Sequence, residues 1–131
     1  MTKRPKTKGC NAERELIHLF WQNRWAASRI AGSGSICYPA PDILAGNNIR
    51  KLAIECKVTK SIKQYLTEKE IDELKEFSTI FGAEPWVAVK FNNVDWFFLT
   101  LDNLDRTEKN HVISLESAKR RGLSISELIT S

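Results

Sequence analysis

The sequence predicts a single domain of the mixed α/β class. Two segments carry apolar residues at the spacing of an amphipathic helix, and several others show the alternation or the short apolar runs of strands. The 131 residues are 42% hydrophobic and 27% charged, a composition that can bury one core. The sequence contains no internal repeat and no low-complexity linker, so we expect residues 1–131 to fold as one unit.

The first half of the chain predicts one helix and three extended segments. Leu16, Ile17, Phe20 and Trp21 recur on one side of a helix that we place at 11–25. The extended segments follow, with a Gly/Ser/Pro loop between the first two: 27–31, the loop 32–41, then 42–45 and 51–58.

A second helix is predicted to start after Thr67, because Glu70 stands three residues further on and completes a capping-box signature. Gly82 ends it, as glycine often does at a helix C-terminus. Its apolar stripe consists of Ile71, Leu74, Phe77, Ile80 and Phe81.

The second half of the chain predicts a strand pair and a weaker tail. Two apolar runs, 85–91 and 95–101, flank Asn92-Asn93, a turn signal typical of a hairpin. Beyond them we expect a strand at 111–115 and a short helix at 124–129.

Charge is distributed unevenly along the chain. Residues 1–64 carry 12 Lys and Arg against 4 acids, whereas residues 65–131 carry 8 against 12. A basic half is typical of a polyanion-binding face, although an uneven solvated surface would give the same totals.

The cellular context is also constrained by composition. Three cysteines without a CxxC pair favour a reducing cytoplasm, and no apolar run is long enough to span a membrane. Residues 1–8 are basic, with no apolar segment of a secretory signal behind them, and we expect them to form a flexible arm.

Three acidic residues occupy positions where an apolar side chain is expected. Glu13 precedes Leu16 and Phe20 by three and seven residues, which places it on the inward side of the first helix. Asp42 heads an apolar strand, and Glu55 lies inside another. Buried carboxylates need a cation.

Lys57 can neutralise only one of these acids. It follows Glu55 by two residues, on the same face of the strand and about 7 Å along it. A divalent metal with oxygen ligands would satisfy the set, and Mg²⁺ is the usual choice where phosphate is also a ligand. The pattern Pro41-Asp42, then Glu55-x-Lys57, therefore predicts metal-assisted phosphodiester hydrolysis, although a bare pattern of this kind also occurs by chance.

The sequence resembles the archaeal-type Holliday junction resolvases of the PD-(D/E)xK nuclease superfamily. The resemblance runs from about residue 8 to residue 98 and departs from the family at Arg24-Trp25. It is carried by Lys8-Gly9, Ala12–Leu16, Arg29, Ala31–Ser33, Pro41–Asn47, Leu52–Lys57 and Phe81-Gly82.

The resemblance implies a restriction-endonuclease-like central mixed β-sheet flanked by helices. It implies that Glu13, Asp42 and Glu55 bind Mg²⁺, which Mn²⁺ would replace, and that Lys57 stabilises the transition state. It also implies a catalytic role for Ser33, and DNA contacts by a set of four residues: Lys8, Arg14, Arg29 and Ser35.

A two-fold homodimer is expected because a four-way junction has two equivalent strands to cut, whereas one domain carries one metal site. The candidate interface consists of aromatic residues that exceed what a small core needs: Phe77, Phe81, Trp96 and Phe98. The alternative is that the residues around Trp96 and Phe98 cover the two faces of their own sheet within a monomer.

The activity that the resemblance implies is resolution of four-way junctions in DNA recombination and repair, by a cellular or virus-encoded enzyme. Two alternatives stay open. One is another PD-(D/E)xK endonuclease that cuts flaps, mismatches or a short sequence. The other is a catalytically idle DNA-binding module.

Overall fold

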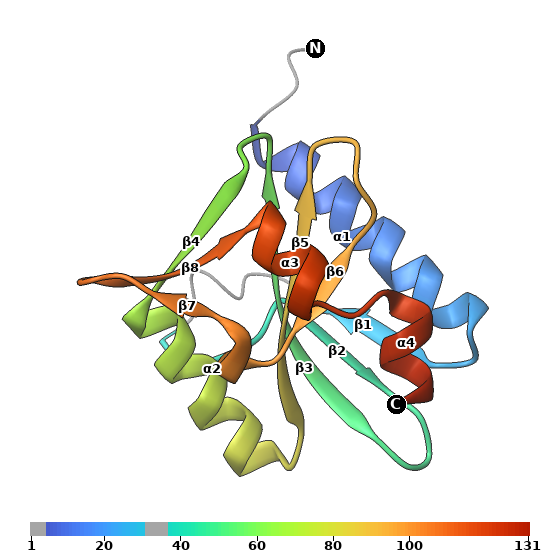
Figure 1. Ribbon diagram of the computed structural model, residues 1–131. Coiled ribbons are helices and arrows are strands. Elements are labelled where there is room, and N and C mark those ends of the chain that lie inside the picture. The colour runs from blue at the N-terminus through green and yellow to red at the C-terminus, as the bar shows by residue number, and fades with distance from the viewer. Residues whose placement is uncertain (1–4, 31–36) are drawn as a thin grey trace.

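The computed structural model describes residues 5–30 and 37–131, with side chains from residue 11 onward within these ranges. Helices surround a central sheet, and a smaller sheet lies beside it (Figure 1). The elements are α1 (Pro5–Gln22), β1 (Ala26–Arg29), β2 (Ile43–Gly46), β3 (Lys51–Thr59), β4 (Lys63–Thr67), α2 (Glu68–Phe81), β5 (Glu84–Phe91), β6 (Phe97–Leu99), the 3-10 turn η1 (Leu101–Asn103), β7 (Asp105–Arg106), β8 (Asn110–Ser114), α3 (Leu115–Arg121) and α4 (Ile125–Thr130).

The central sheet has the strand order β1-β2-β3-β5-β6. Its neighbours are antiparallel except β3 and β5, which run parallel and are joined through β4 and α2. The mixed α/β class predicted from the sequence is confirmed, and so is the hairpin formed by β5 and β6. The second sheet has the order β4-β8-β7.

The two faces of the central sheet bury separate apolar clusters. On one face Leu16 and Phe20 of α1 and Leu128 of α4 pack against Ile54. On the other face the smaller sheet, α2 and α3 cover Ala53 and its neighbours. Alternation along β3 places Glu55 on the same face as Ala53, so Glu55 points towards the α2 side.

Helix α2 follows the sequence prediction closely. Thr67 caps its first turn through a capping box with Glu70, and Gly82 ends it in the left-handed conformation with φ of 84°. Ile71 and Leu74 are buried, whereas Ile80 is 80% exposed and does not belong to the core stripe. The apolar face of α2 therefore ends one turn earlier than its sequence suggests.

Helix α1 differs from the prediction at both ends. It begins at Pro5, so residues 5–8 of the expected flexible arm are helical, and residues 1–4 lie outside the described residues. It ends at Gln22, before Arg24 adopts a positive φ of 66°. Trp21 was expected in the core stripe but is 56% exposed, because its indole nitrogen donates instead to the Ala27 carbonyl.

Four of the described elements were not predicted: β4, the turn η1, β7 and α3. Strand β4 is short and mostly polar, and its pairing with the distant β8 gives no local signal. Helix α3 has only two buried residues, although Ser114 and Ser117 form its capping box. No helix in the described part of the chain is long and apolar enough to cross a membrane.

The expected contribution of Trp96 and Phe98 to a dimer interface is wrong. Their exposed fractions are 4% and 0%, because both side chains pack into the α1 side of the core. Phe98 makes an edge contact with Phe20 of α1 at 6.2 Å between ring centroids. A side chain already buried within the protomer has no surface left for a partner.

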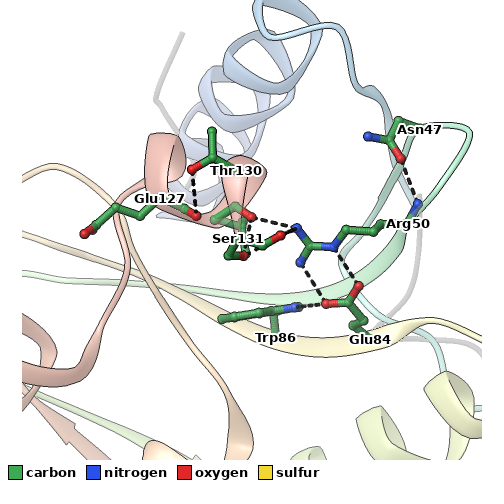
Figure 2. A network of polar contacts seen from close by, with 8 residues as sticks. Asn47, Arg50, Glu84, Trp86, Glu127, Thr130 and Ser131 are labelled. Atoms are coloured by element: carbon green, nitrogen blue, oxygen red, sulfur yellow. Dashed lines mark hydrogen bonds and ion pairs between the residues drawn. The ribbon is translucent and has the colours of Figure 1, made fainter.

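Arg50 fastens the C-terminal helix to the central sheet (Figure 2). Its guanidinium forms two hydrogen bonds with the Glu84 carboxylate, at 2.9 and 2.8 Å, and lies 5.5 Å from the ring centroid of Trp25. The same group donates to the carbonyls of Leu128 and Ser131 at 2.8 and 3.2 Å. Arg50, which lies at the turn between β2 and β3, thus has a structural role.

We predict that Arg50→Ala lowers the free energy of unfolding by about 2 kcal/mol, because it removes a charge-assisted pair and leaves carbonyls at the end of α4 without their donor. Urea denaturation followed by circular dichroism measures the change. Arg120→Ala is the matched control, since Arg120 is exposed on α3 and should shift stability by less than about 0.5 kcal/mol. Equal effects of the two substitutions would contradict this role.

Candidate active site

The register of β2 and β3 brings Asp42 and Glu55 together. The two strands are antiparallel, Ile43 pairs with Ile54, and the Asp42 amide donates to the Ile54 carbonyl at 3.0 Å. Asp42 and Glu55 are the next residues beyond this pair, and their side chains lie close enough to form a hydrogen bond. The Cys56 backbone amide donates to Asp42 Oδ2 at 2.8 Å, which fixes the orientation of this carboxylate.

Glu55 is electrostatically strained by this neighbour. Burial, followed by the charge of Asp42, raises the pKa of Glu55 to about 8, against the opposing effect of Lys57. A hydrogen bond to the Asp42 carboxyl group favours the protonated form further. Two facing carboxylates that hold a proton between them are a donor set that suits a hard divalent cation, which would take the place of that proton.

Glu13 comes from α1, on the opposite face of the sheet, and lies close enough to Asp42 for the charge of that residue to affect its pKa. Burial and then the charge of Asp42 raise its pKa, whereas Arg29 lowers it. Arg29 Nε donates to Glu13 Oε1 at 2.9 Å. Among the described residues, no three acidic, histidine or cysteine side chains already stand at metal-coordination distances. The direct pair is therefore Asp42 and Glu55, with Glu13 beside it and bound to Arg29.

Lys57 lies on the Glu55 face of β3, as predicted, but its amine contacts Glu70 of α2. Burial raises the pKa of Glu70, and the hydrogen bonds from Lys57 and from the Thr67 backbone outweigh that effect and lower it. A cavity of about 240 Å³ separates the two sides of the site, with Asp42 and Glu55 on one wall and Glu70 on the other. Sequence reasoning missed Glu70 as a site residue, because its capping-box signature already explained it.

The other predicted site residues are only partly described. Ser33 and Ser35 lie outside the described residues, and Lys8 lies in α1 where side chains are not described. Arg14 is exposed on α1, next in sequence to Glu13. Arg29 remains 38% exposed at its side chain while bound to Glu13.

A mixed sheet with a proline–aspartate at the start of one strand and a glutamate-x-lysine on its neighbour defines a nuclease of the PD-(D/E)xK type, a class that uses divalent metals. The sequence model of the archaeal Holliday junction resolvase (Hjc) family matches residues 4–131. The chain belongs to this family.

Individual relatives agree with this assignment. The chain is 44% identical over 123 residues to the crossover junction endodeoxyribonuclease Hjc of Archaeoglobus fulgidus, covering 94% of this chain and 90% of that one. It is 35% identical over 122 residues to Hjc of Methanocaldococcus jannaschii, covering 93% and 86%. The crystal structure of Archaeoglobus fulgidus Hjc, a Holliday junction resolvase, superposes with a TM-score of 0.87 at 41% identity, over 92% and 97% of the chains.

We predict that the metal-free protein loses stability as the pH rises from about 4.5 to about 8. In this window folded Glu55 holds a proton that the unfolded chain has released, so folding takes up a proton and raising the pH opposes it. The loss should be on the order of a few kcal/mol. Denaturation in EDTA at several pH values measures it.

Glu55→Gln should flatten this pH dependence, and the exposed Glu108→Gln should leave it unchanged. Adding Mg²⁺ at pH 8 should stabilise the wild type and have a smaller effect on Glu55→Gln. A wild-type slope that survives in Glu55→Gln would show that another group titrates.

Proposed function

We propose that the chain is a Mg²⁺-dependent endonuclease that resolves four-way DNA junctions by paired symmetric incisions during recombination and repair. Crossover junction endodeoxyribonuclease activity is the activity of the family to which the chain belongs. The observation that carries the proposal is the facing pair of Asp42 and Glu55, with Lys57 on the same face of β3. A resolvase works where DNA recombines, so we place its activity at the nucleoid, on cellular or viral DNA.

Asp42, Glu55 and Glu13 are the residues that would hold the metal, and Mn²⁺ should replace Mg²⁺ there. When bound, the ion supplies a water molecule of lowered pKa and neutralises charge that develops on the phosphate. The hydrogen bond from the Cys56 amide orients the Asp42 carboxylate at the cavity. Lys57 contributes a positive charge beside the reacting phosphate and stabilises the transition state.

DNA binding is assigned to basic residues on the α1 side of the site. Arg14 and Arg29 would contact phosphates that flank the cut, and Lys8 and Ser35 would extend the contact along the strand. Arg29 is bound to Glu13, so it would join the DNA backbone to the metal-binding group. Ser33 would act in catalysis from the loop between β1 and β2.

A homodimer would deliver the two incisions, and the end of α2 supplies its surface. Phe81 and Ile80 are 48% and 80% exposed, and the Phe81 ring stacks on Phe77 at 5.2 Å between centroids. Phe81 also borders a largely apolar depression of about 500 Å³ formed with β1 and β2, including Leu44. Exposed apolar surface of this kind is typical of a protein interface.

We predict that Asp42→Asn and Glu55→Gln each reduce cleavage of a synthetic four-way junction by a factor on the order of 100 or more, because each removes a charged metal ligand. Junction binding should persist, since phosphate contacts supply the affinity. Asp72→Asn, an exposed acid on α2, is the control and should cut at the wild-type rate.

The same assay separates the alternatives. Symmetric, ligatable nicks in the junction with Mg²⁺ support the proposal, whereas binding without nicking at any metal concentration would identify an idle DNA-binding module. Faster cutting of flaps, mismatched duplex or one linear sequence would point to another PD-(D/E)xK endonuclease.

We predict that the wild type sediments as a dimer at micromolar concentration and that the double substitution Ile80→Asp with Phe81→Asp yields a monomer, because it places two charges in the apolar interface. Ile62→Asp is the matched control, since Ile62 is 68% exposed and lies between β3 and β4. The monomer should retain DNA binding but lose paired incision. A wild type that sediments as a single chain would contradict the dimer.

A further inference from the structure

Lys57 is held by a residue to which the sequence pattern assigns no catalytic role. Its amine contacts Glu70 Oε2, and the two side chains are 23% and 31% exposed. We propose that Glu70 is a positioning residue, which fixes the Lys57 amine at the catalytic cavity for the junction cleavage proposed above. The kinetic test of this inference rests on that proposed function, whereas the second test uses the metal-free protein and needs no cleavage.

The Glu70 side chain is also held by the first turn of its own helix. It is the third residue of α2, and its Oε1 accepts from the Thr67 backbone amide at 2.9 Å. The Thr67 hydroxyl accepts in return from the Glu70 amide at 3.0 Å, which completes the capping box. One carboxylate oxygen thus closes the first turn of α2 and the other binds Lys57.

A flexible lysine side chain at this position needs a partner that holds its amine in place. Its four-carbon stem is flexible, and holding it in one conformation costs rotamer freedom. Asp42 and Glu55 face Glu70 across the cavity, and the charge of Lys57 acts on Glu55, so these acids would otherwise attract the amine into the place of a metal ion. Glu70 holds the amine on the α2 wall, so Lys57 stays beside the carboxylates without occupying them.

Glu70→Gln separates the two contacts that the carboxylate makes. A glutamine has a single acceptor oxygen, and glutamine is accepted at this position of a capping box. If that oxygen keeps the Thr67 amide, the side-chain NH₂ faces the Lys57 ammonium and cannot accept from it. Glu76→Gln is the matched control, because Glu76 lies further along α2, is exposed and stands outside the lining of the cavity.

The kinetic test uses a synthetic four-way junction under single-turnover conditions. Glu70→Gln should cut about 10-fold more slowly, while its junction affinity in Ca²⁺ stays within twofold of wild type or tightens through the loss of a negative charge. Glu76→Gln should match the wild type in rate. In a Lys57→Ala background Glu70→Gln should have no further effect, because Glu70 acts through the amine.

The second test needs no metal and no cleavage. Acylation of lysines in EDTA, read by mass spectrometry, should modify Lys57 faster in Glu70→Gln than in wild type, whereas Lys75, exposed on the same helix and outside the cavity lining, should react equally in both. Circular dichroism checks that the variant is folded.

Wild-type cutting by Glu70→Gln, or an equal loss in Glu76→Gln, would overturn the inference. A wild type that cuts no junction would overturn the proposed function instead, and faster Lys57 labelling in the variant would then still support the contact.

Discussion

The antiparallel pairing of β2 with β3 sets the position of every other part of the active site. It brings Asp42 and Glu55 together beyond one end of a short ladder, and the Cys56 amide then holds the Asp42 carboxylate in place. A shift of one residue in this pairing would turn the acids to opposite faces of the sheet. The register is protected by burial, because Ile43 and Ile54, which pair next to the acids, are fully buried against α1. The hydrophobic core thus maintains an arrangement of charges that is unfavourable by itself.

Basic residues around the site form ion pairs with some of its acidic residues. Arg29 binds Glu13, and Lys57 binds Glu70, so the two basic residues of the site are each engaged by a carboxylate at its border. At the central pair, burial and the charge of Asp42 raise the pKa of Glu55 and favour its protonated form. This distribution suits a nuclease, because a divalent cation bound by both acids would relieve the repulsion between their charges.

Local patterns in the sequence predicted the fold where a signal was contained in neighbouring residues. The capping box at Thr67, the alternation along β3 and the asparagine turn between β5 and β6 are of this kind, and each was confirmed. Strand β4 escaped because it depends on pairing with β8, some fifty positions away. Trp96 and Phe98 were wrongly assigned to a dimer interface. A strand that is apolar on both faces has the same sequence pattern whether a partner subunit or the helices of its own chain cover it. Glu70 was missed because one residue carries two roles and the local one is sufficient to explain it.

Helix α2 joins the catalytic pocket to the surface proposed for dimerisation. Its first turn holds Lys57 through Glu70, and its last turn exposes Ile80 and Phe81. Ile71 and Leu74 bury the middle of the helix against the smaller sheet and β5, so its two ends are parts of one packed body. A partner that docks on the Phe81 end would therefore meet an element whose other end already positions the catalytic lysine. In a symmetric pair the two lysines are then held at a fixed separation by two copies of the same helix, which is the geometric requirement for cutting two strands of one junction.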